Sequence, residues 1–186
     1  MIESLSSVTT LYHGSYCEVQ TPKLELCKKF KDFGQGFYLT TNIEQARQFA
    51  ILTTRKAFDS GIINEIKWNG VVSCFTYEPH PSDKIKIYES ANSDWLHCVV
   101  AHRRKHTFDS VVADLSQYDI IGGKVANDAT NATILAYMSG LYGPIGTTQA
   151  DAICIGLLLP ERLENQFCFR SNQSIGHLNF KESFRL

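Results

Sequence analysis

The sequence predicts an α+β fold in which antiparallel or mixed strands are interrupted by short helices. Several runs rich in Val, Ile, Phe and Tyr read as strands, and other stretches place apolar residues at helical spacing behind Asn or Thr. The aromatic content of 11%, with 11 Phe and 8 Tyr, favours strands or an aromatic-lined pocket over a helical bundle. The length of 186 residues fits a single domain, residues 1–186.

The chain is organised around residues 32–41, which read Asp-Phe-Gly-Gln-Gly-Phe-Tyr-Leu-Thr-Thr. Two glycines bracket one glutamine and precede an aromatic and aliphatic run, which predicts a turn feeding a strand. A helix over 42–58 should follow at once, because Asn42 and Gln45 resemble a capping box. Tyr38 would therefore sit just after a flexible turn, where a flat aromatic face can floor a pocket for a planar ligand.

The first half of the chain supplies strands around this centre. Residues 9–13 predict a first strand ended by Gly14-Ser15, and 16–31 predict a lysine-rich surface loop. Residues 66–77 alternate and contain Asn69-Gly70, so they predict one strand or a tight hairpin. Residues 84–88 alternate Lys and Ile before a Tyr, which is typical of a half-buried strand.

The second half mixes helices and strands. A helix is expected from Asn92 to the basic run at 103–106, whose charge suits the helix dipole. Strand-like runs cover 108–115 and 118–125, and helices are expected at 131–141 and 147–158, the last stopped by Pro160. A final strand is expected at 166–170, with the tail through Phe180 pairing or packing beside it.

Charge and composition exclude several classes of protein. A formal net charge of −1 and a pI near 6.6 give no overall positive field to recruit nucleic acid or an acidic membrane. The start lacks the basic-then-apolar order of a signal peptide, and no apolar run could span a bilayer, so we expect a soluble, cytoplasmic protein. Six cysteines without a CxxC pair are expected to remain buried, reduced thiols.

Familiar catalytic and metal motifs are also missing. Gly122-Gly123-Lys124 is neither a dinucleotide fingerprint nor a phosphate-binding loop, and neither GxSxG nor HExxH occurs. His102 and His106 are one helical turn apart, but they lie in a basic run that would repel a cation. No flanking sequence supports a Cys/His nucleophile. We therefore expect no metal cofactor.

What remains is His13-Gly14 at a strand end, Tyr38 after the glycine turn, and a polar residue on the late strand. Taken singly, such a histidine is more often structural and such a tyrosine more often core. Taken in order, Tyr12-His13-Gly14-Ser15 and the run 36–41 resemble the first two motifs of the ADP-ribosyltransferase superfamily. The resemblance is to its His-Tyr-Glu branch, that of diphtheria toxin and the poly(ADP-ribose) polymerases.

The chain is more closely similar to a bacterial family that is catalogued as a domain of unknown function and assigned to that superfamily. The matching segments are 11–15, 32–50, 94–103, 118–130 and 160–180, so the resemblance covers nearly the whole chain. It implies a split antiparallel and mixed β-sheet core of ADP-ribosyltransferase type with short flanking helices. It also implies chemistry on NAD as substrate, in which nicotinamide is expelled and ADP-ribose passes to an acceptor.

The resemblance further implies individual roles. His13 would bind the adenosine-side ribose, the Gly14 backbone would approach the nicotinamide carboxamide, and Tyr38 would stack on the nicotinamide ring. The catalytic set would be His13, Tyr38 and Gln166. The NAD-binding set would be His13, Gly14, Ser15, Gly36, Tyr38, Thr40, Asn127 and Asp128. Residues 127–130 match a polar family motif and would border the acceptor side.

The departure from the branch lies at Gln166, where the superfamily places a Glu that stabilises the developing positive charge. A neutral amide can hydrogen-bond ribose hydroxyls but cannot act as a base, and Glu164 or Glu161 would have to substitute. Three functions follow: a mono-ADP-ribosyltransferase for a protein or nucleic-acid acceptor, a NAD glycohydrolase, or a silent module that binds NAD, ADP-ribose or a partner. Family analogy adds a toxin-like or defence role with a small antitoxin-like partner.

Overall fold

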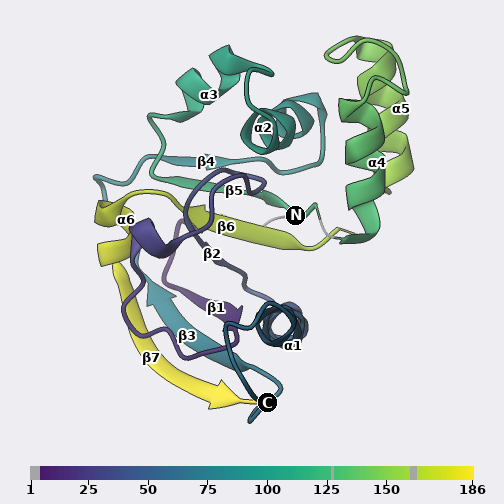
Figure 1. Cartoon of the computed structure of the whole chain (residues 1–186). Helices are drawn as coiled ribbons and strands as arrows, with labels where there is room; N and C mark the ends of the chain where they lie inside the picture. The colour runs from purple at the N-terminus through teal and green to yellow at the C-terminus, as the bar shows by residue number, and fades with distance from the viewer. Residues whose placement is uncertain (1–4, 127, 160–162) are drawn as a thin grey trace.

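A computed structural model describes residues 5–126, 128–159 and 163–186, and these residues form two β-sheets (Figure 1). One sheet is antiparallel and has the strand order β1 (Thr9–Ser15), β3 (Val71–Tyr77), β7 (Leu178–Arg185). The other has the order β2 (Phe37–Leu39), β6 (Asn165–Phe169), β5 (Ile120–Lys124), β4 (Ile85–Ile87). The second sheet is mixed, because β4 and β5 run parallel. The predicted α+β class is confirmed.

Helices connect the strands. They are α1 (Ile43–Asp59), α2 (Ser93–Arg103), α3 (Asp109–Leu115), α4 (Asp128–Met138), α5 (Thr148–Leu158), α6 (Asn172–Gly176) and the short η1 (Leu24–Leu26). The side chains of Asn42, Asn92 and Thr147 accept backbone N–H groups at the starts of α1, α2 and α5, which satisfies donors that a helix leaves free. Within the described ranges, no helix combines the length and apolarity needed to cross a bilayer.

The elements stack in layers (Figure 1). Phe37, Phe75, Phe167 and their neighbours form a core between the two sheets. A larger core around Trp95 lies between the mixed sheet and helices α2 to α5. Helix α1 covers the remaining face of the antiparallel sheet through Ala46 and Ala50.

The two sheets meet edge to edge, because β1 is an edge of one and β2 an edge of the other. A single antiparallel bridge joins them: the Tyr12 N–H donates to the Thr40 carbonyl at 2.8 Å, and the Thr40 N–H donates to the Tyr12 carbonyl at 3.0 Å. We call this line of contact between β1 and β2 the seam. It is the feature that positions the candidate site.

The predicted strand after the glycine turn and the helix behind it are confirmed. Residues 37–39 form a strand after the glycine turn, and α1 begins directly behind Asn42. The capping box is not completed, however, because the Gln45 side chain accepts a hydrogen bond from the Thr40 hydroxyl at 2.6 Å. The helix start is thereby tied to the strand before it.

Two local predictions were wrong, and a third was confirmed in one of its two alternatives. Residues 109–115 are a helix, because Val111 and Leu115, one turn apart, both pack on the core under α2. Residues 66–70 form no strand or hairpin: the Asn69 N–H donates to the Leu186 carbonyl, and the Leu186 N–H to the Gly70 carbonyl. The tail does not pair with β6, because α6 turns the chain and β7 joins β3, but it packs beside it as expected, since Leu178 and Phe180 contact the core that contains Phe167 and Phe169.

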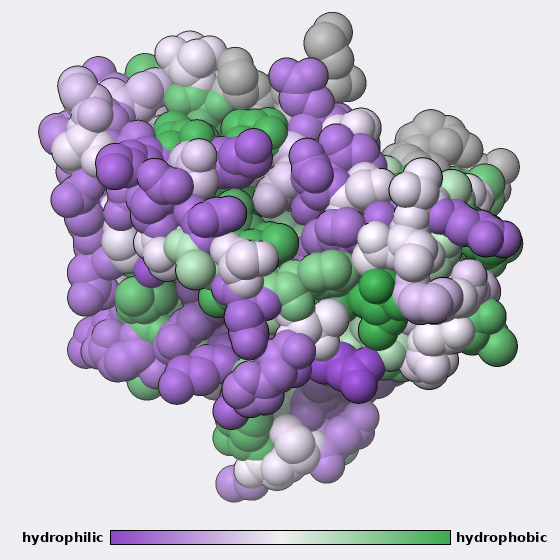
Figure 2. Space-filling model, turned by 90° about the horizontal axis from the view of Figure 1, so that it is seen from above, coloured by the Kyte–Doolittle hydropathy of each residue, from purple (hydrophilic) through white to green (hydrophobic). Residues whose placement is uncertain are grey.

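The surface is uneven in polarity. Viewed from above, the part over α4 and α5 shows pale and green residues, whereas the opposite side is largely purple (Figure 2). Leu141 is 72% exposed and Leu157 is 56% exposed in this helical hairpin. The hairpin therefore presents an apolar surface to solvent.

Candidate active site

The backbone pairing of β1 with β2 ends after the Tyr12–Thr40 bridge. Beyond it, the His13 side chain connects the two strands. His13 Nδ1 lies 2.8 Å from the Tyr38 carbonyl oxygen. Because a carbonyl only accepts, Nδ1 must carry the hydrogen, and Nε2 of the neutral ring is then an acceptor. Burial lowers the pKa of His13, more than the hydrogen bond to Tyr38 raises it, which favours this neutral form. The ring packs on Phe37 with centroids 4.3 Å apart.

Gly14 directs its peptide groups into the seam. Alternate residues of a strand point their N–H and C=O to the same edge, and Tyr12 uses that edge to bond Thr40. Among the described residues, no hydrogen-bond partner is found for the Gly14 N–H or C=O. One donor and one acceptor are thus presented side by side where β2 has left the ladder.

A side chain at position 14 is excluded by α1. A Cβ there would lie 2.0 Å from the Ala46 carbonyl oxygen and 2.7 Å from the Ala50 nitrogen. Gly36 is restricted in the same way, since a Cβ would lie 2.4 Å from the Cys168 Sγ atom. Both glycines are required by close packing, and for Gly14 that packing also fixes the peptide edge in the seam.

Tyr38 lies on the other face of the sheet from His13. Tyr12 and Thr40 face each other across the bridge, so strand alternation puts Tyr38 on their side. The Tyr38 hydroxyl accepts from the Phe33 N–H at 2.9 Å and donates to the Gly34 carbonyl at 2.9 Å. Its ring stacks toward Phe33, with centroids 6.5 Å apart, so a planar ligand would have to use the opposite ring face. Burial raises the pKa of Tyr38 well above the usual range and keeps the hydroxyl protonated.

Gln166 is held by a buried carboxylate. Its Nε2 atom donates to Asp32 Oδ2 at 2.8 Å, and the Ala126 N–H donates to the same oxygen at 3.0 Å. Arg103 approaches the other oxygen with Nε at 2.9 Å and Nη2 at 2.6 Å. The side chains of Arg103 and Asp32 are only 17% and 9% exposed, so the ion pair is shielded from water.

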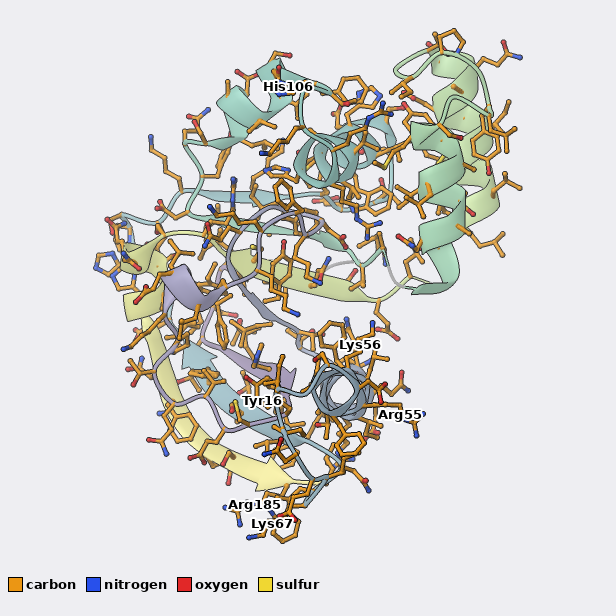
Figure 3. All side chains as sticks on the ribbon, viewed as in Figure 1. Tyr16, Arg55, Lys56, Lys67, His106 and Arg185 are labelled. Atoms are coloured by element: carbon orange, nitrogen blue, oxygen red, sulfur yellow. The ribbon has the colours of Figure 1, made fainter. Side chains whose placement is uncertain are left out.

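The network reaches the start of α4 as well. Arg103 donates from Nη1 to the Asn131 side chain at 3.0 Å and from Nη2 to the Ala126 carbonyl at 2.8 Å. Lys31 lies among further positive charges. Burial lowers its pKa, the charges of Lys28, Lys56 and Arg103 lower it further, and Asp32 raises it. Lys56 is labelled on α1 in Figure 3. Positive charge therefore gathers around the Asp32 side of the site.

The other predicted residues have varied surroundings. Thr40 is buried, and its hydroxyl accepts from the Asn42 N–H and donates to Gln45. Ser15 ends β1 opposite Val71. Asn127 lies outside the described residues, and Asp128 begins α4.

The possible substitutes for a catalytic Glu differ in position. Glu164 is exposed and accepts a hydrogen bond from the Asn42 side chain at 3.1 Å. Glu161 lies outside the described residues. The described carboxylate that contacts Gln166 is neither of these but Asp32.

Of the three predicted catalytic residues, the structure places His13 and Tyr38 at the seam, on opposite faces, and Gln166 on the neighbouring strand β6. His13 lies on one face, Tyr38 and Gln166 on the other, and the Tyr38 carbonyl connects them. Sequence reasoning assigned no role to Asp32 or Arg103. No local pattern marks them, since Asp32 directly follows a lysine-rich stretch and Arg103 lies in the basic run 103–106.

A cavity of about 600 Å³ adjoins the seam at its other end. It lies beyond the Tyr12–Thr40 bridge and is lined by Ser6, Ser7, Val8, Thr9, Thr10, Tyr12 and Thr41. None of the predicted catalytic residues lines it. We therefore base the candidate site on the broken ladder rather than on this cavity.

Comparison with known proteins gives one match. The model of the family described as "Protein of unknown function (DUF3990)" matches residues 9–180, which include β1, the glycine turn, α2 and β6. No curated protein and no solved structure matches the chain. The matched region contains every predicted catalytic residue and both members of the Asp32–Arg103 pair. The chain belongs to the DUF3990 family.

Proposed function

We propose that this protein is an enzyme, a NAD-dependent mono-ADP-ribosyltransferase that acts on a protein or nucleic-acid acceptor. The observation that carries the proposal is the interrupted ladder between β1 and β2. There the Gly14 peptide edge faces β2 beyond the Tyr12–Thr40 bridge, with no backbone hydrogen bond across the seam among the described residues, beside a neutral histidine with a fixed tautomer. The ADP-ribosyltransferase-type sheet core is part of the same proposal.

The seam suits the nicotinamide end of NAD. A carboxamide carries one acceptor and two donor hydrogens, which complement the adjacent N–H and C=O of Gly14. A ligand lying edge-on in the seam would meet His13 from one face and Tyr38 from the other. His13 Nε2 would accept a hydrogen bond from a ribose hydroxyl, and the ring face of Tyr38 turned away from Phe33 would stack on the nicotinamide.

Asp32 gives Gln166 a defined orientation. Because the amide nitrogen donates to Asp32, the amide oxygen is left to accept hydrogen bonds from ribose hydroxyls. When the bond between the ribose and nicotinamide breaks, its electron pair leaves with nicotinamide and positive charge develops on the ribose. The acceptor then attacks the ribose carbon that carried nicotinamide and loses a proton. The oriented amide dipole of Gln166 would stabilise the positive charge on the ribose.

The positive charge near Asp32 suits the pyrophosphate of NAD. The charges of Lys28, Lys56 and Arg103 all act on Lys31 and lower its pKa after burial. An anionic group beside Lys31 would offset this repulsion. This supports a dinucleotide rather than a neutral ligand.

One observation favours a second candidate, a module that binds NAD or ADP-ribose without turnover. The Asp32 charge is compensated by Arg103, so the group that contacts Gln166 is a neutral ion pair rather than a free carboxylate. Such a pair stabilises a developing cation less than an uncompensated carboxylate would. Binding would survive, whereas bond breaking would be slow.

The test is nicotinamide release from NAD by the purified chain, with and without cell lysate, beside His13→Ala and Tyr38→Ala. His106→Ala is the matched control, since His106 is exposed and projects from the far end of the molecule (Figure 3). Release that rises with lysate, labels a macromolecule and needs both residues is the expected result. Release without any labelled acceptor identifies a glycohydrolase. Binding of NAD without release of nicotinamide identifies the silent module. If the chain neither binds NAD nor releases nicotinamide, the proposal is overturned.

A further inference from the structure

His80, Asp83 and His177 form a cluster that the proposed function does not use. His80 and Asp83 lie between β3 and β4, and His177 directly follows α6. One potential ligand atom from each residue lies within 4.8 Å of the others, and no other group of this kind occurs among the described residues. Figure 1 shows the connection between β3 and β4 beside α6.

Asp83 is the fixed point of the cluster. Its side chain is fully buried, and His177 Nδ1 lies 3.0 Å and 2.9 Å from its two oxygens. The Tyr77 hydroxyl donates to Oδ2 at 3.0 Å, and the Gln173 amide donates to Oδ1 at 3.3 Å. A carboxylate oriented in this way by outer hydrogen bonds resembles the ligating carboxylates of metal sites.

His80 supplies the open side. It is exposed, and its ring stacks on His177 with centroids 4.1 Å apart and planes inclined by 23°. His80 Nδ1 accepts a hydrogen bond from the Ser82 N–H at 3.3 Å and lies 2.7 Å from the Ser82 hydroxyl, so it carries the lone pair of the ring and can exchange these partners for a metal ion. Two imidazoles are thus held side by side next to one buried anion.

We propose that His80, Asp83 and His177 bind a divalent transition-metal ion, with Zn²⁺ the best fit. Two imidazoles and one carboxylate suit Zn²⁺ and its neighbours in the first row, whereas Mg²⁺ and Ca²⁺ prefer oxygen ligands alone. Three protein ligands leave a coordination position for water. The site is separate in its residues from the NAD site, so either proposal can fail without the other.

Binding requires a local rearrangement of the three side chains. Metal–ligand bonds of about 2.0–2.2 Å bring ligand atoms to roughly 3–3.5 Å from one another, so exposed His80 must swing inward. The ligating nitrogen of His177 gives its proton to solvent, and two bonds to the metal replace the His177–Asp83 hydrogen bond. The metal would join the segment after β3 to the start of β7.

The experiment is titration of the metal-free full chain with ZnCl₂ by calorimetry, repeated with CoCl₂ to follow visible absorption of the bound ion. We expect one ion per chain, a dissociation constant at least tenfold weaker in His80→Ala, and a raised melting temperature with Zn²⁺ in the wild type. His80→Ala is preferred to His177→Ala, which would leave Asp83 buried without its partner and could unfold the chain.

Two controls separate this site from other ligands. His106→Ala removes an exposed histidine outside the cluster, and Cys17→Ser removes the exposed thiol, another Zn²⁺ ligand. Both should bind Zn²⁺ as tightly as the wild type. The proposal is overturned if the wild type binds no ion, if His80→Ala binds unchanged, or if Cys17→Ser is the variant that loses binding.

Discussion

The amide of Gln166 donates a 2.8 Å hydrogen bond to the carboxylate of Asp32, which lies 134 residues earlier in the chain. This contact connects β6 to the start of the glycine turn. The same carboxylate also holds Arg103 at the end of α2, so Asp32 joins all three segments. Position 166 must therefore satisfy Asp32 before it can serve a substrate. That condition explains why a Glu at this position would be costly in this chain.

Replacing Gln166 by Glu should destabilise the fold, and more at pH 8 than at pH 5. The new carboxylate would face Asp32 Oδ2 where the amide now donates, so its folded-state pKa would be raised by like charge. Below the unfolded-state pKa of about 4.3, the new carboxyl group is protonated in both states. As pH rises above this value, the unfolded chain ionises more readily than the folded chain, so the free energy of unfolding falls. Urea unfolding at both pH values measures this. Gln48→Glu, at an exposed position on α1, is the control, and equal losses in both variants would refute the prediction.

Replacing Arg103 by Gln should lower the free energy of unfolding by about 3–5 kcal/mol, because Asp32 would remain buried without its cation. The neighbouring Arg104 provides a matched control, since it is exposed and, in the part of the chain that the structure describes, its side chain donates to the Met138 carbonyl alone. Arg104→Gln should cost less than about 1 kcal/mol. Denaturant unfolding of both variants checks the difference, and similar losses would show that the buried pair contributes little.

Replacing Gly14 by Ala should destabilise the protein by more than about 3 kcal/mol, beyond the usual cost of overpacking. The added methyl group would lie 2.0 Å from a backbone oxygen of α1, which cannot move without shifting the helix. Gly156→Ala is the opposite case, because nothing lies within 4 Å of a Cβ added there, in the last turn of α5. That variant should gain about 0.5–1 kcal/mol from helix propensity. A thermal melt that leaves Gly14→Ala unchanged would contradict the packing argument.

Short-range patterns predicted much of this fold from the sequence. The strand at 37–39, the cap at Asn42 and the helix behind it follow from neighbouring residues, and each was confirmed. Residues 109–115 were misassigned because Val-Val is typical of strands, whereas packing under α2 decided for a helix. Tertiary context also decided the partner of β7, which local alternation does not encode.

The candidate site divides in the same way. His13, Tyr38 and Gln166 lie in recognisable local patterns, so they could be named in advance. The Asp32–Arg103 pair joins residues 71 positions apart, and Asp83 and His177 are 94 apart. Nothing in either neighbourhood indicates such a partner, since each residue alone reads as an ordinary surface charge or histidine.

The reactivity of each cysteine toward a disulfide reagent should decrease as its burial increases. Cys17 is exposed and Cys27 partly buried, whereas Cys74, Cys98, Cys154 and Cys168 are buried. Burial raises the pKa of Cys98, Cys154 and Cys168 to about 12, so these thiols hold almost no thiolate near neutrality. At pH 8 a disulfide reagent should modify one thiol rapidly, one slowly and the other four only after unfolding. Cys17→Ser should remove the rapid phase, and rapid labelling of three or more native thiols would disprove the assignment.

Stability should fall as pH drops below about 6.5, in part because of His13. Burial lowers its pKa in the folded state, so below the unfolded value the unfolded chain binds a proton that the folded chain resists. His102 acts in the same direction for the same main reason. His13→Asn should keep a donor for the Tyr38 carbonyl and remove the titration, which would reduce the slope between pH 6.5 and 5 by up to about 1.4 kcal/mol per pH unit. Urea unfolding across this range measures the slope. An unaltered slope in His13→Asn would contradict the prediction, because the His13 ring would then already take up its proton in the folded seam.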